Sequence, residues 1–203
     1  MTDFEERYRA VTGKIAAVTI ALDERDETTR EHCDRVCGLA LDLGRKCGLT
    51  ERELNALQMA AVFHDVGKIG IPDRILKAPR KLTQDELWMM QTHSLRSERI
   101  VRSAHLEDGD LVALAVRHHH ERFDGTGYPD KLTGESIPVL SRIVAVVDAY
   151  DAMAALRHHG PLRAHAGIMA ELRRCEGAQH DAYMIRNFEE IIEHSPHKAE
   201  GRT

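Results

Sequence analysis

Residues 49–65 read LTERELNALQMAAVFHD, and this stretch decides the fold class. Thr50 and Glu53 form a capping box, in which each side chain satisfies a free backbone N–H at the start of a helix. The apolar residues that follow recur at helical spacing and end at the pair His64-Asp65. The stretch therefore predicts an amphipathic helix that delivers a histidine and an aspartate at its carboxyl end.

The same helix-start signature recurs in residues 82–87, LTQDEL, and helical spacing dominates the rest of the chain. Four further helices are predicted around residues 32–43, 110–120, 141–153 and 182–194. The third of these is rich in β-branched residues, but its length and its helical apolar face favour a helix over a strand. Because no other segment alternates with period two, we predict an all-α bundle.

A heptad seam runs through the first 22 residues, at alternating spacings of four and three. It consists of Phe4, Tyr8, Val11, Ile15, Val18 and Leu22. Either this helix pairs with a second copy or connects to a partner, or it lies on its own domain. The predicted organisation is an N-terminal helix over residues 1–22, a main domain over residues 23–194, and a tail over residues 195–203 that frays.

The composition is that of a globular chain, with 42% hydrophobic and 30% charged residues. A net charge of -5 argues against nucleic-acid binding through a basic surface. The longest apolar run, residues 15–22, is too short to cross a bilayer, and the acidic start does not resemble a signal peptide. Four cysteines without an export signal do not suggest disulfides. We expect a cytoplasmic protein without nucleic-acid or membrane partners.

Histidine is unusually frequent, with 13 residues in the chain. Several histidines and aspartates fall at the ends or on the inward faces of separate predicted helices. They are His32, His64, Asp65, His93, His119, His120 and Asp148. Any one alone could be a hydrogen-bonded core residue. Several buried imidazoles and carboxylates all need partners, however, and a shared cation would satisfy them together.

This donor set also constrains the metal. More than four imidazoles and carboxylates, with no cysteine, do not fit a closed structural zinc site. They fit two octahedral first-row ions, iron or manganese, bridged by an aspartate, and such a pair suits displacement at phosphorus. Lys68, one helical turn after His64, could hold a phosphate oxygen; alternatively it is a solvated lysine favoured by the helix dipole.

Two longer motifs carry a specific resemblance. Residues 64–72 read HDVGKIGIP, and residues 119–129 read HHERFDGTGYP. Together they resemble the HD-GYP branch of the HD phosphohydrolases, over about residues 23–188. The resemblance implies an HD-domain helical bundle with a dinuclear or trinuclear metal site. It also implies hydrolysis of cyclic di-GMP to the linear dinucleotide or GMP.

The resemblance further implies individual roles. The seven histidines and aspartates named above become the metal ligands, with Asp65 bridging, and Asp65 and Lys68 become catalytic. The loop Gly127-Tyr128-Pro129 borders the substrate pocket and is a candidate surface for protein partners, although a rigid turn is the simpler interpretation. The implied substrate contacts are Lys68, Asp124, Gly127, Tyr128, Pro129 and Arg157.

The chain departs from the family pattern at several positions. Members with a third metal carry a glutamate one helical turn before the first ligand histidine, where this chain has Thr28, so we predict two metals. The stretch after the last aspartate reads Arg157-His158-His159-Gly160 and retains only the arginine of the family's Arg-Pro-Tyr-Lys-like pattern. Ser94 and Ser97 replace the usual proline and glycine. His118 lies outside the family's histidine pair and is expected in the core or on the surface.

Three hypotheses about function follow. The first is a metal-dependent phosphodiesterase acting on cyclic di-GMP. The second, motivated by the altered residues 157–160, is a signalling adaptor that keeps the metal and has weak catalysis. The third is an HD nucleotidase acting on another phosphoester, because the sequence does not define a base pocket.

Overall fold

Both capping boxes start helices in the computed structural model, which describes residues 30–155 and 164–199. Thr50 and Glu53 cap α3 (Glu51–Phe63), and Thr83 and Glu86 cap α5 (Gln84–Ser103). In each box the side chains satisfy backbone N–H groups reciprocally. Such a cap typically stabilises a helix by about 1 kcal/mol.

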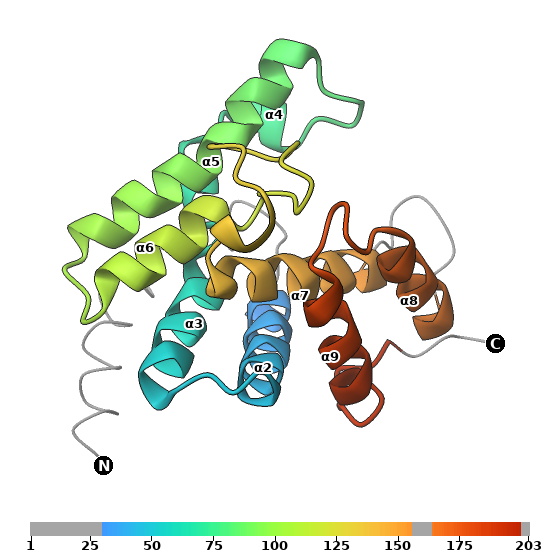
Figure 1. Cartoon of the computed structure of the whole chain (residues 1–203). Helices are drawn as coiled ribbons and strands as arrows, with labels where there is room; N and C mark the ends of the chain where they lie inside the picture. Colours follow the sequence, from blue (N-terminus) through green and yellow to red (C-terminus); the bar gives the residue numbers. More distant parts are fainter. Residues whose placement is uncertain (1–29, 156–163, 200–203) are drawn as a thin grey trace.

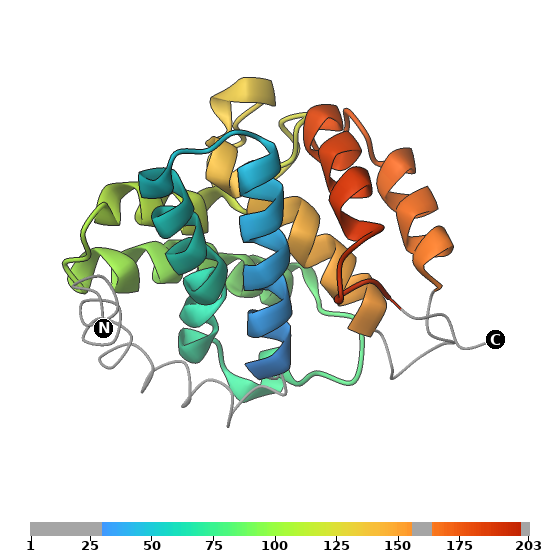
Figure 2. The same cartoon turned by 90° about the horizontal axis from the view of Figure 1, so that it is seen from below.

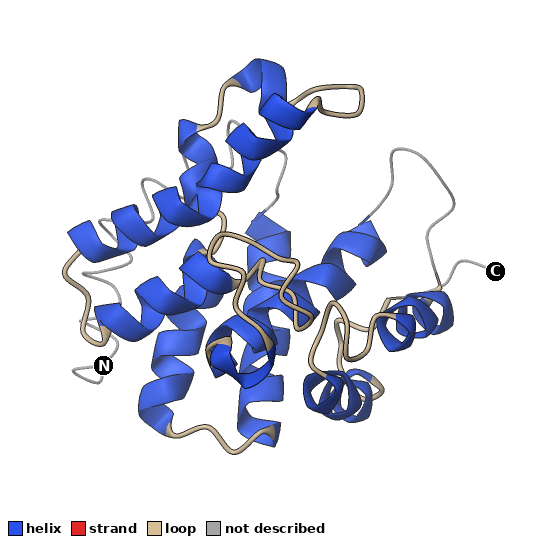
Figure 3. Cartoon of the chain, turned by 45° about the horizontal axis from the view of Figure 1, so that its top comes forward, coloured by secondary structure: helices blue, strands red, loops and turns tan. Residues whose placement is uncertain are grey.

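The regular elements of the described residues are helices joined by loops, and none of these residues forms a named strand (Figure 3). The prediction of an all-α fold is therefore confirmed. The remaining elements, labelled as in Figure 1, are α2 (Arg30–Lys46), η1 (Val66–Gly70), α4 (Asp73–Leu76), α6 (Gly109–His118), η2 (Gly134–Ser136), α7 (Val139–Ala155), α8 (His165–Arg174) and α9 (Ala182–Ile192).

Helix α7 crosses the middle of the molecule and packs against α2, α3, α6, α8 and α9 (Figure 1). On one side α2 and α3 lie next to each other, as the view from below shows (Figure 2). On another side α5 pairs with α6, and η1 packs on α5. Because α2, α3, α6 and α7 all contact at least two of the others, residues far apart in sequence meet between them.

The apolar faces predicted from helical spacing form the core. On α2 the buried side chains are Val36, Leu39, Ala40 and Leu43. They join buried residues of α3, α6 and α7 in one cluster. Each large aliphatic side chain buried in this way contributes roughly 1.5–3 kcal/mol to stability. The core therefore anchors the helices that carry the predicted site residues.

Helix α8 was not predicted from the sequence. Its N-cap residue, Ala164, offers no side-chain cap, so the usual signal for a helix start is absent. The helix nevertheless buries Ile168, Met169 and Leu172. Its existence therefore depends on packing against α7 and α9 rather than on a local signal.

Several predictions fall outside the described residues, namely the heptad seam, Thr28 and Arg157. Of the predicted tail, residues 195–199 are described, and the amide of Ala199 donates a hydrogen bond of 2.9 Å to the Tyr150 hydroxyl. In the described part of the chain, no helix combines the length and the apolar character needed to span a bilayer.

Candidate metal centre

Seven residues predicted as metal ligands come from five places in the fold and lie together in two neighbouring groups. They lie at the start of α2, at the end of α3, on α5, just after α6, and on α7. In each group the donor atoms are within 4.8 Å of one another. The four-ligand group consists of Asp65, His93, His119 and His120. The three-ligand group consists of His32, His64 and Asp148.

His64 joins the two groups. Its Nε2 lies 3.3 Å from Asp65 Oδ2 and 3.7 Å from Asp148 Oδ1. Asp65 caps η1 with φ −101° and ψ 1°, in the sparsely populated bridge region where active-site residues recur. Asp65, a member of the four-ligand group, therefore lies beside a histidine of the three-ligand group, and its bridging role stays a prediction.

Three of these histidines are oriented by their own helices, through hydrogen bonds from Nδ1 to a carbonyl three residues earlier. The bonds run from His64 to Ala61 (2.8 Å), from His93 to Met90 (2.8 Å) and from His119 to Val116 (2.7 Å). A carbonyl can only accept, so the proton lies on Nδ1. Nε2 is left with its lone pair directed into the cluster, which is the state that a metal ligand needs.

The centre of the cluster contains acceptors that face one another. Nε2 of His93 and Nε2 of His119 lie only 3.4 Å apart. In the described part of the chain, His64 Nε2 and Asp65 Oδ1 are buried and have no hydrogen-bond partner. Lone pairs and a carboxylate packed in this way repel one another unless a cation lies among them. The donors therefore fit metal ions.

Burial keeps most of these imidazoles neutral. It lowers the pKa of His93, and it lowers that of His120 to about 4. Burial, with a further contribution from His120, holds the pKa of His119 well below its usual value. Although burial alone would raise the pKa of Asp65, the charges of Lys68 and His64 hold it well below its usual range. His64 differs: burial alone would lower its pKa, but the Asp65 and Asp148 carboxylates hold it well above the usual value. The cluster thus contains neutral imidazoles at His93, His119 and His120 and an ionised carboxylate at Asp65, in their ligating forms.

Lys68 lies on η1 and its ammonium is 2.7 Å from Asp65 Oδ2. Its side chain is only 23% exposed, so the alternative of a fully solvated lysine is not supported. The lysine places a positive charge beside Asp65, at the partly exposed edge of the cluster.

The contact of η1 with α5 depends on a glycine and a serine. A Cβ on Gly67 would lie 2.0 Å from the His93 carbonyl oxygen, so only glycine permits this approach. Ser97 Oγ donates to the His64 carbonyl (2.8 Å) and accepts from the Gly67 amide (2.9 Å). Ser97, which departs from the family pattern, therefore connects the segments that carry two predicted ligands.

His32 is the exception among the histidines because its Nδ1 contacts a side chain from another helix. It lies 2.6 Å from Asp151 Oδ2 on α7. Arg35, one turn after His32, donates to both oxygens of the same carboxylate, at 2.6 and 3.0 Å. The sequence analysis assigned no role to Asp151 or Arg35. The available signal was the matching spacing of three in the pairs His32/Arg35 and Asp148/Asp151.

The loop of the second motif lies over the four-ligand group. The Tyr128 ring is 5.0 Å from the His120 ring, centroid to centroid. A Cβ on Gly127 would lie 2.3 Å from the Arg122 backbone nitrogen, so this glycine permits the tight fold of the loop. The peptide bond between Tyr128 and Pro129 is cis. The loop is therefore a tight turn that lies next to the cluster.

Asp124 lies on the same loop but outside the cluster. Its carboxylate accepts hydrogen bonds from Thr126 and Arg122. These contacts stabilise the turn, and the predicted contact of Asp124 with substrate stays a prediction. Glu121, whose role was also missed, is buried and accepts from the amides of Asp130 and Leu132.

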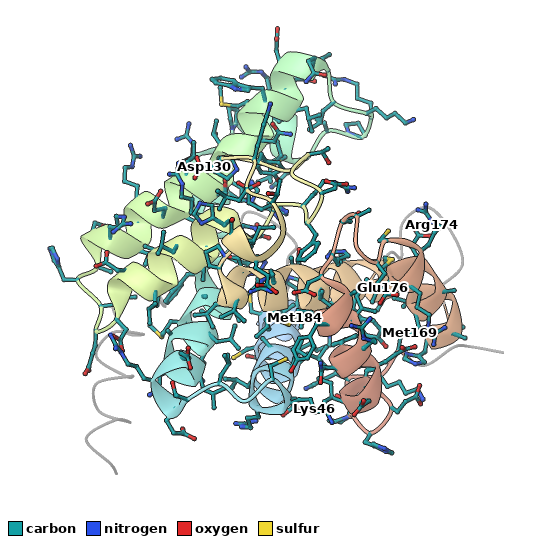
Figure 4. The ribbon with its side chains drawn as sticks, in the orientation of Figure 1. Lys46, Asp130, Met169, Arg174, Glu176 and Met184 are labelled. Atoms are coloured by element: carbon teal, nitrogen blue, oxygen red, sulfur yellow. The ribbon has the colours of Figure 1, made fainter. Side chains whose placement is uncertain are left out.

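His118 is buried but has no nitrogen free for a metal. Nδ1 contacts the Leu114 carbonyl at 3.0 Å, and Nε2 contacts Asp130 Oδ2 at 2.8 Å. Arg117 also binds Asp130 with two nitrogens. Figure 4 labels Asp130 on the loop that follows α6, beside α5. The structure therefore explains why the first of three consecutive histidines stands apart.

A further residue absent from the sequence predictions is His180, in the loop between α8 and α9. It is 5% exposed, and its Nδ1 has no partner within the described ranges. The preceding residues hold the second-motif loop, because the Asp124 amide donates to Ala178 and the Phe123 amide to Gln179. No sequence motif pointed to this contact between distant segments.

Comparison with known proteins agrees with this geometry. A family model described as an HD domain matches residues 16–181. The chain is 40% identical over 157 residues to the cyclic di-GMP phosphodiesterase response regulator RpfG of Xanthomonas campestris pv. campestris (strain 8004), covering 77% of this chain and 41% of that protein. It is 31% identical over 194 residues to a 3'3'-cGAMP-specific phosphodiesterase 2 of Vibrio cholerae, covering 96% and 36%.

The fold also matches a solved structure. A cyclic GMP-AMP-specific phosphodiesterase of V. cholerae, V-cGAP3, superposes with a TM-score of 0.67 at 20% identity, covering 89% of this chain and 48% of that one. At this identity the likeness concerns the fold alone. In each comparison the chain spans less than half the length of the similar protein.

Proposed function

Because this chain belongs to the HD-domain family and carries both motifs of its HD-GYP branch, we propose that it is a metal-dependent phosphodiesterase. Its proposed substrate is cyclic di-GMP, hydrolysed to the linear dinucleotide or GMP. The observation that supports this most directly is the pair of Nε2 nitrogens of His93 and His119, 3.4 Å apart beside Asp65 Oδ1, which has no hydrogen-bond partner among the described residues. A cation among these atoms would make that arrangement favourable.

The seven clustered residues would hold two divalent ions, iron or manganese, with Asp65 between them. When bound, such a pair supplies Lewis acidity toward a phosphate group and lowers the pKa of bound water. Lys68 would contribute its ammonium to the phosphate charge, since it stands beside Asp65 at the open edge. Asp65 and Lys68 are therefore the proposed catalytic residues.

The substrate would lie against the second-motif loop. Tyr128 is packed beside His120, and burial, followed by the Asp65 carboxylate, raises the pKa of its hydroxyl above the ordinary value. The hydroxyl thus stays protonated and can donate to a phosphate or a base. Gly127 and Pro129 shape this wall, and Asp124 and Arg157 are further proposed contacts.

The choice among dinucleotides remains a proposal. Similar proteins are named for cyclic di-GMP and for 3'3'-cGAMP, and both substrates share a phosphodiester ring. We place cyclic di-GMP first because the two motifs resemble the HD-GYP branch. A cytoplasmic location, protein partners at the Gly127-Tyr128-Pro129 loop, and a homodimer through residues 4–22 stay predictions.

The test pairs metal content with turnover on one anaerobically purified sample. We expect about two iron or manganese ions per chain and metal-dependent loss of cyclic di-GMP, followed by product chromatography. Asp65→Ala should abolish turnover while the far-ultraviolet circular dichroism stays helical. A fully metallated, folded protein that leaves cyclic di-GMP intact at every metal tried would refute the proposal.

One observation favours a second candidate. The altered residues Arg157-His158-His159-Gly160 suit an adaptor that keeps the metal and binds the dinucleotide without turnover. Tight binding of cyclic di-GMP in calorimetry, with no product after prolonged incubation, would favour this candidate. The third candidate is an HD nucleotidase. A panel that includes 3'3'-cGAMP and mononucleotide phosphoesters distinguishes it, because the phosphoester that is cleaved identifies the activity.

A further inference from the structure

The three-ligand group, which would hold the second metal ion, is supported differently from the four-ligand group, which would hold the first. In the four-ligand group, His93 and His119 are oriented by carbonyls of their own helices. In the three-ligand group, His32 depends on a carboxylate that α7 supplies from 119 positions away in sequence. A carbonyl within the same helix is present whenever the helix forms. The Asp151 contact exists only while α2 and α7 are packed together.

The geometry of this contact is well defined. Asp151 Oδ2 lies 2.6 Å from His32 Nδ1, and Arg35 donates to both carboxylate oxygens. Asp151 is 2% exposed. A buried carboxylate needs compensation, and Arg35 together with His32 provides it. Burial alone would raise the pKa of Asp151, but hydrogen bonds from His32 and Arg35 lower it.

The two helices also carry the ligands themselves. His32 and Arg35 are one turn apart on α2, as Asp148 and Asp151 are on α7. His32 Nε2 lies 3.7 Å from Asp148 Oδ1. One turn of each helix therefore supplies a proposed metal donor. The next turn of α7 supplies Asp151, which contacts His32, and the next turn of α2 supplies Arg35, which binds Asp151.

We propose that Asp151 is the positioning residue of the three-ligand group and that Arg35 holds it in place. The second ion is thereby made dependent on the contact between α2 and α7, while the first is not. This inference rests on the proposed metal-dependent function. It extends that function by making the two metal positions unequal, so that one can be lost while the other stays filled.

The physical basis is the hydrogen bond from Nδ1 to a carboxylate. Such a bond fixes the tautomer and the ring orientation, and it increases the basicity of Nε2. Loss of a partner of this kind typically weakens metal binding about 10–100-fold. The effect should fall on the ion that His32 holds and leave the four-ligand group unchanged.

The chain contains a matched control. His118, Asp130 and Arg117 form a second histidine–aspartate–arginine set with similar distances, 2.8 Å from ring to carboxylate and 2.7 Å from guanidinium to carboxylate. His118 belongs to neither of the two groups described above; it lies with Glu121 and Asp130 in a separate group of donors, and both of its ring nitrogens contact protein oxygens. Asp130→Asn therefore removes the same kind of charge without touching a ligand-orienting contact.

The experiment titrates metal-free protein with Mn²⁺ and follows free Mn²⁺ by electron paramagnetic resonance. The wild type should bind two ions. Asp151→Asn should retain one ion with unchanged affinity and bind the other 10–100-fold more weakly. Asp130→Asn should bind both ions like the wild type. Arg35→Lys keeps a positive charge but loses the two hydrogen bonds to Asp151. It should weaken binding of the same ion by a smaller factor.

The inference is overturned if Asp151→Asn binds both ions normally, if both ions weaken equally, or if the wild type binds only one. Circular dichroism of each metal-free variant checks that it is folded. If Asp151→Asn does not fold, Arg35→Lys is tested in the same way, by whether it weakens the binding of one ion and not of the other. Turnover is measured separately, so a protein that binds two ions unequally but hydrolyses no dinucleotide contradicts the proposed function and leaves this inference standing.

Discussion

Two histidine–aspartate–arginine sets in this molecule use the same chemistry in different ways. The inner set is His32, Asp151 and Arg35, and the outer set is His118, Asp130 and Arg117. In the inner set the aspartate takes Nδ1, and Nε2 stays free beside Asp148. In the outer set a carbonyl takes Nδ1 and the aspartate takes Nε2, so no ring nitrogen is left.

The difference shows that residue type and burial do not make a histidine a ligand. Both rings are nearly buried, and both contact a carboxylate that an arginine also binds. What differs is which nitrogen keeps its lone pair and where that nitrogen lies. The same rule separates His118 from His119, which follows it directly in sequence.

The largest expected effect comes from substituting alanine for one of two neighbouring histidines. His119→Ala removes a proposed direct ligand, so kcat/KM for cyclic di-GMP should fall by more than about 100-fold, beyond the usual loss for an outer partner. His118→Ala removes only the outer set, and turnover should change less than about tenfold. Steady-state kinetics with metal-loaded proteins measures both. Equal losses in the two variants would break the comparison.

The next largest expected effect is the loss of thermal stability when the metal is removed. At a free metal concentration about 100 times the dissociation constant, one ion stabilises the fold by about 2.7 kcal/mol. That corresponds to roughly 5–10 °C for a chain of this size. The shift between chelated and metal-loaded samples should be unchanged in His118→Ala and about halved in His32→Ala. A smaller shift in His118→Ala than in His32→Ala, by calorimetry, would contradict the assignment.

The two aspartates should differ in their contribution to the metal-free fold. Asp151 is almost fully buried, so Asp151→Asn removes the buried carboxylate charge that Arg35 and His32 bind and should lower the free energy of unfolding by about 2 kcal/mol. Asp130 is 36% exposed, and Asp130→Asn should cost about 1 kcal/mol. Urea unfolding of the metal-free proteins measures both. A larger loss for Asp130→Asn would reverse the order of the two sets.

The smallest effect is a pH dependence of the outer set. Hydrogen bonds from Arg117, with a smaller contribution from His118, hold the pKa of Asp130 well below its usual range. A carboxylate whose folded pKa is lowered stabilises the fold above its unfolded pKa of about 3.9 and loses that contribution as the pH falls further. The stability difference between wild type and Asp130→Asn should be constant from about pH 7 to pH 5 and shrink below about pH 4. A difference that grows on acidification would show that Asp130 is not the stabilising charge.

Much of the fold could be predicted from the sequence because its signals are local. Capping boxes and apolar faces depend on residues three or four positions apart, and both boxes start helices as predicted. Helix α8 was missed because Ala164 offers no cap and tertiary packing stabilises the helix instead. The helix from residue 110 was extended too far, since α6 ends at His118 and His119 caps it.

The site could be predicted in its membership but not in its arrangement. The motifs and helical faces pointed to seven ligands, and the structure places all seven in two neighbouring groups. The division into those groups could not be predicted, nor could the roles of Arg35 and Asp151. Each depends on contacts between helices, and the His32–Asp151 bond joins residues 119 positions apart.

The amino-acid order by itself determined the capped and amphipathic helices and the donor types, because these follow from neighbouring residues and from side-chain chemistry. Only the tertiary structure decided which imidazole nitrogens stay free, which aspartate lies between two groups and which arginine compensates a buried carboxylate. The physical reason is that a hydrogen bond or a coordination bond depends on direction and distance in space. Those are set only when α2, α3, α5, α6 and α7 pack together.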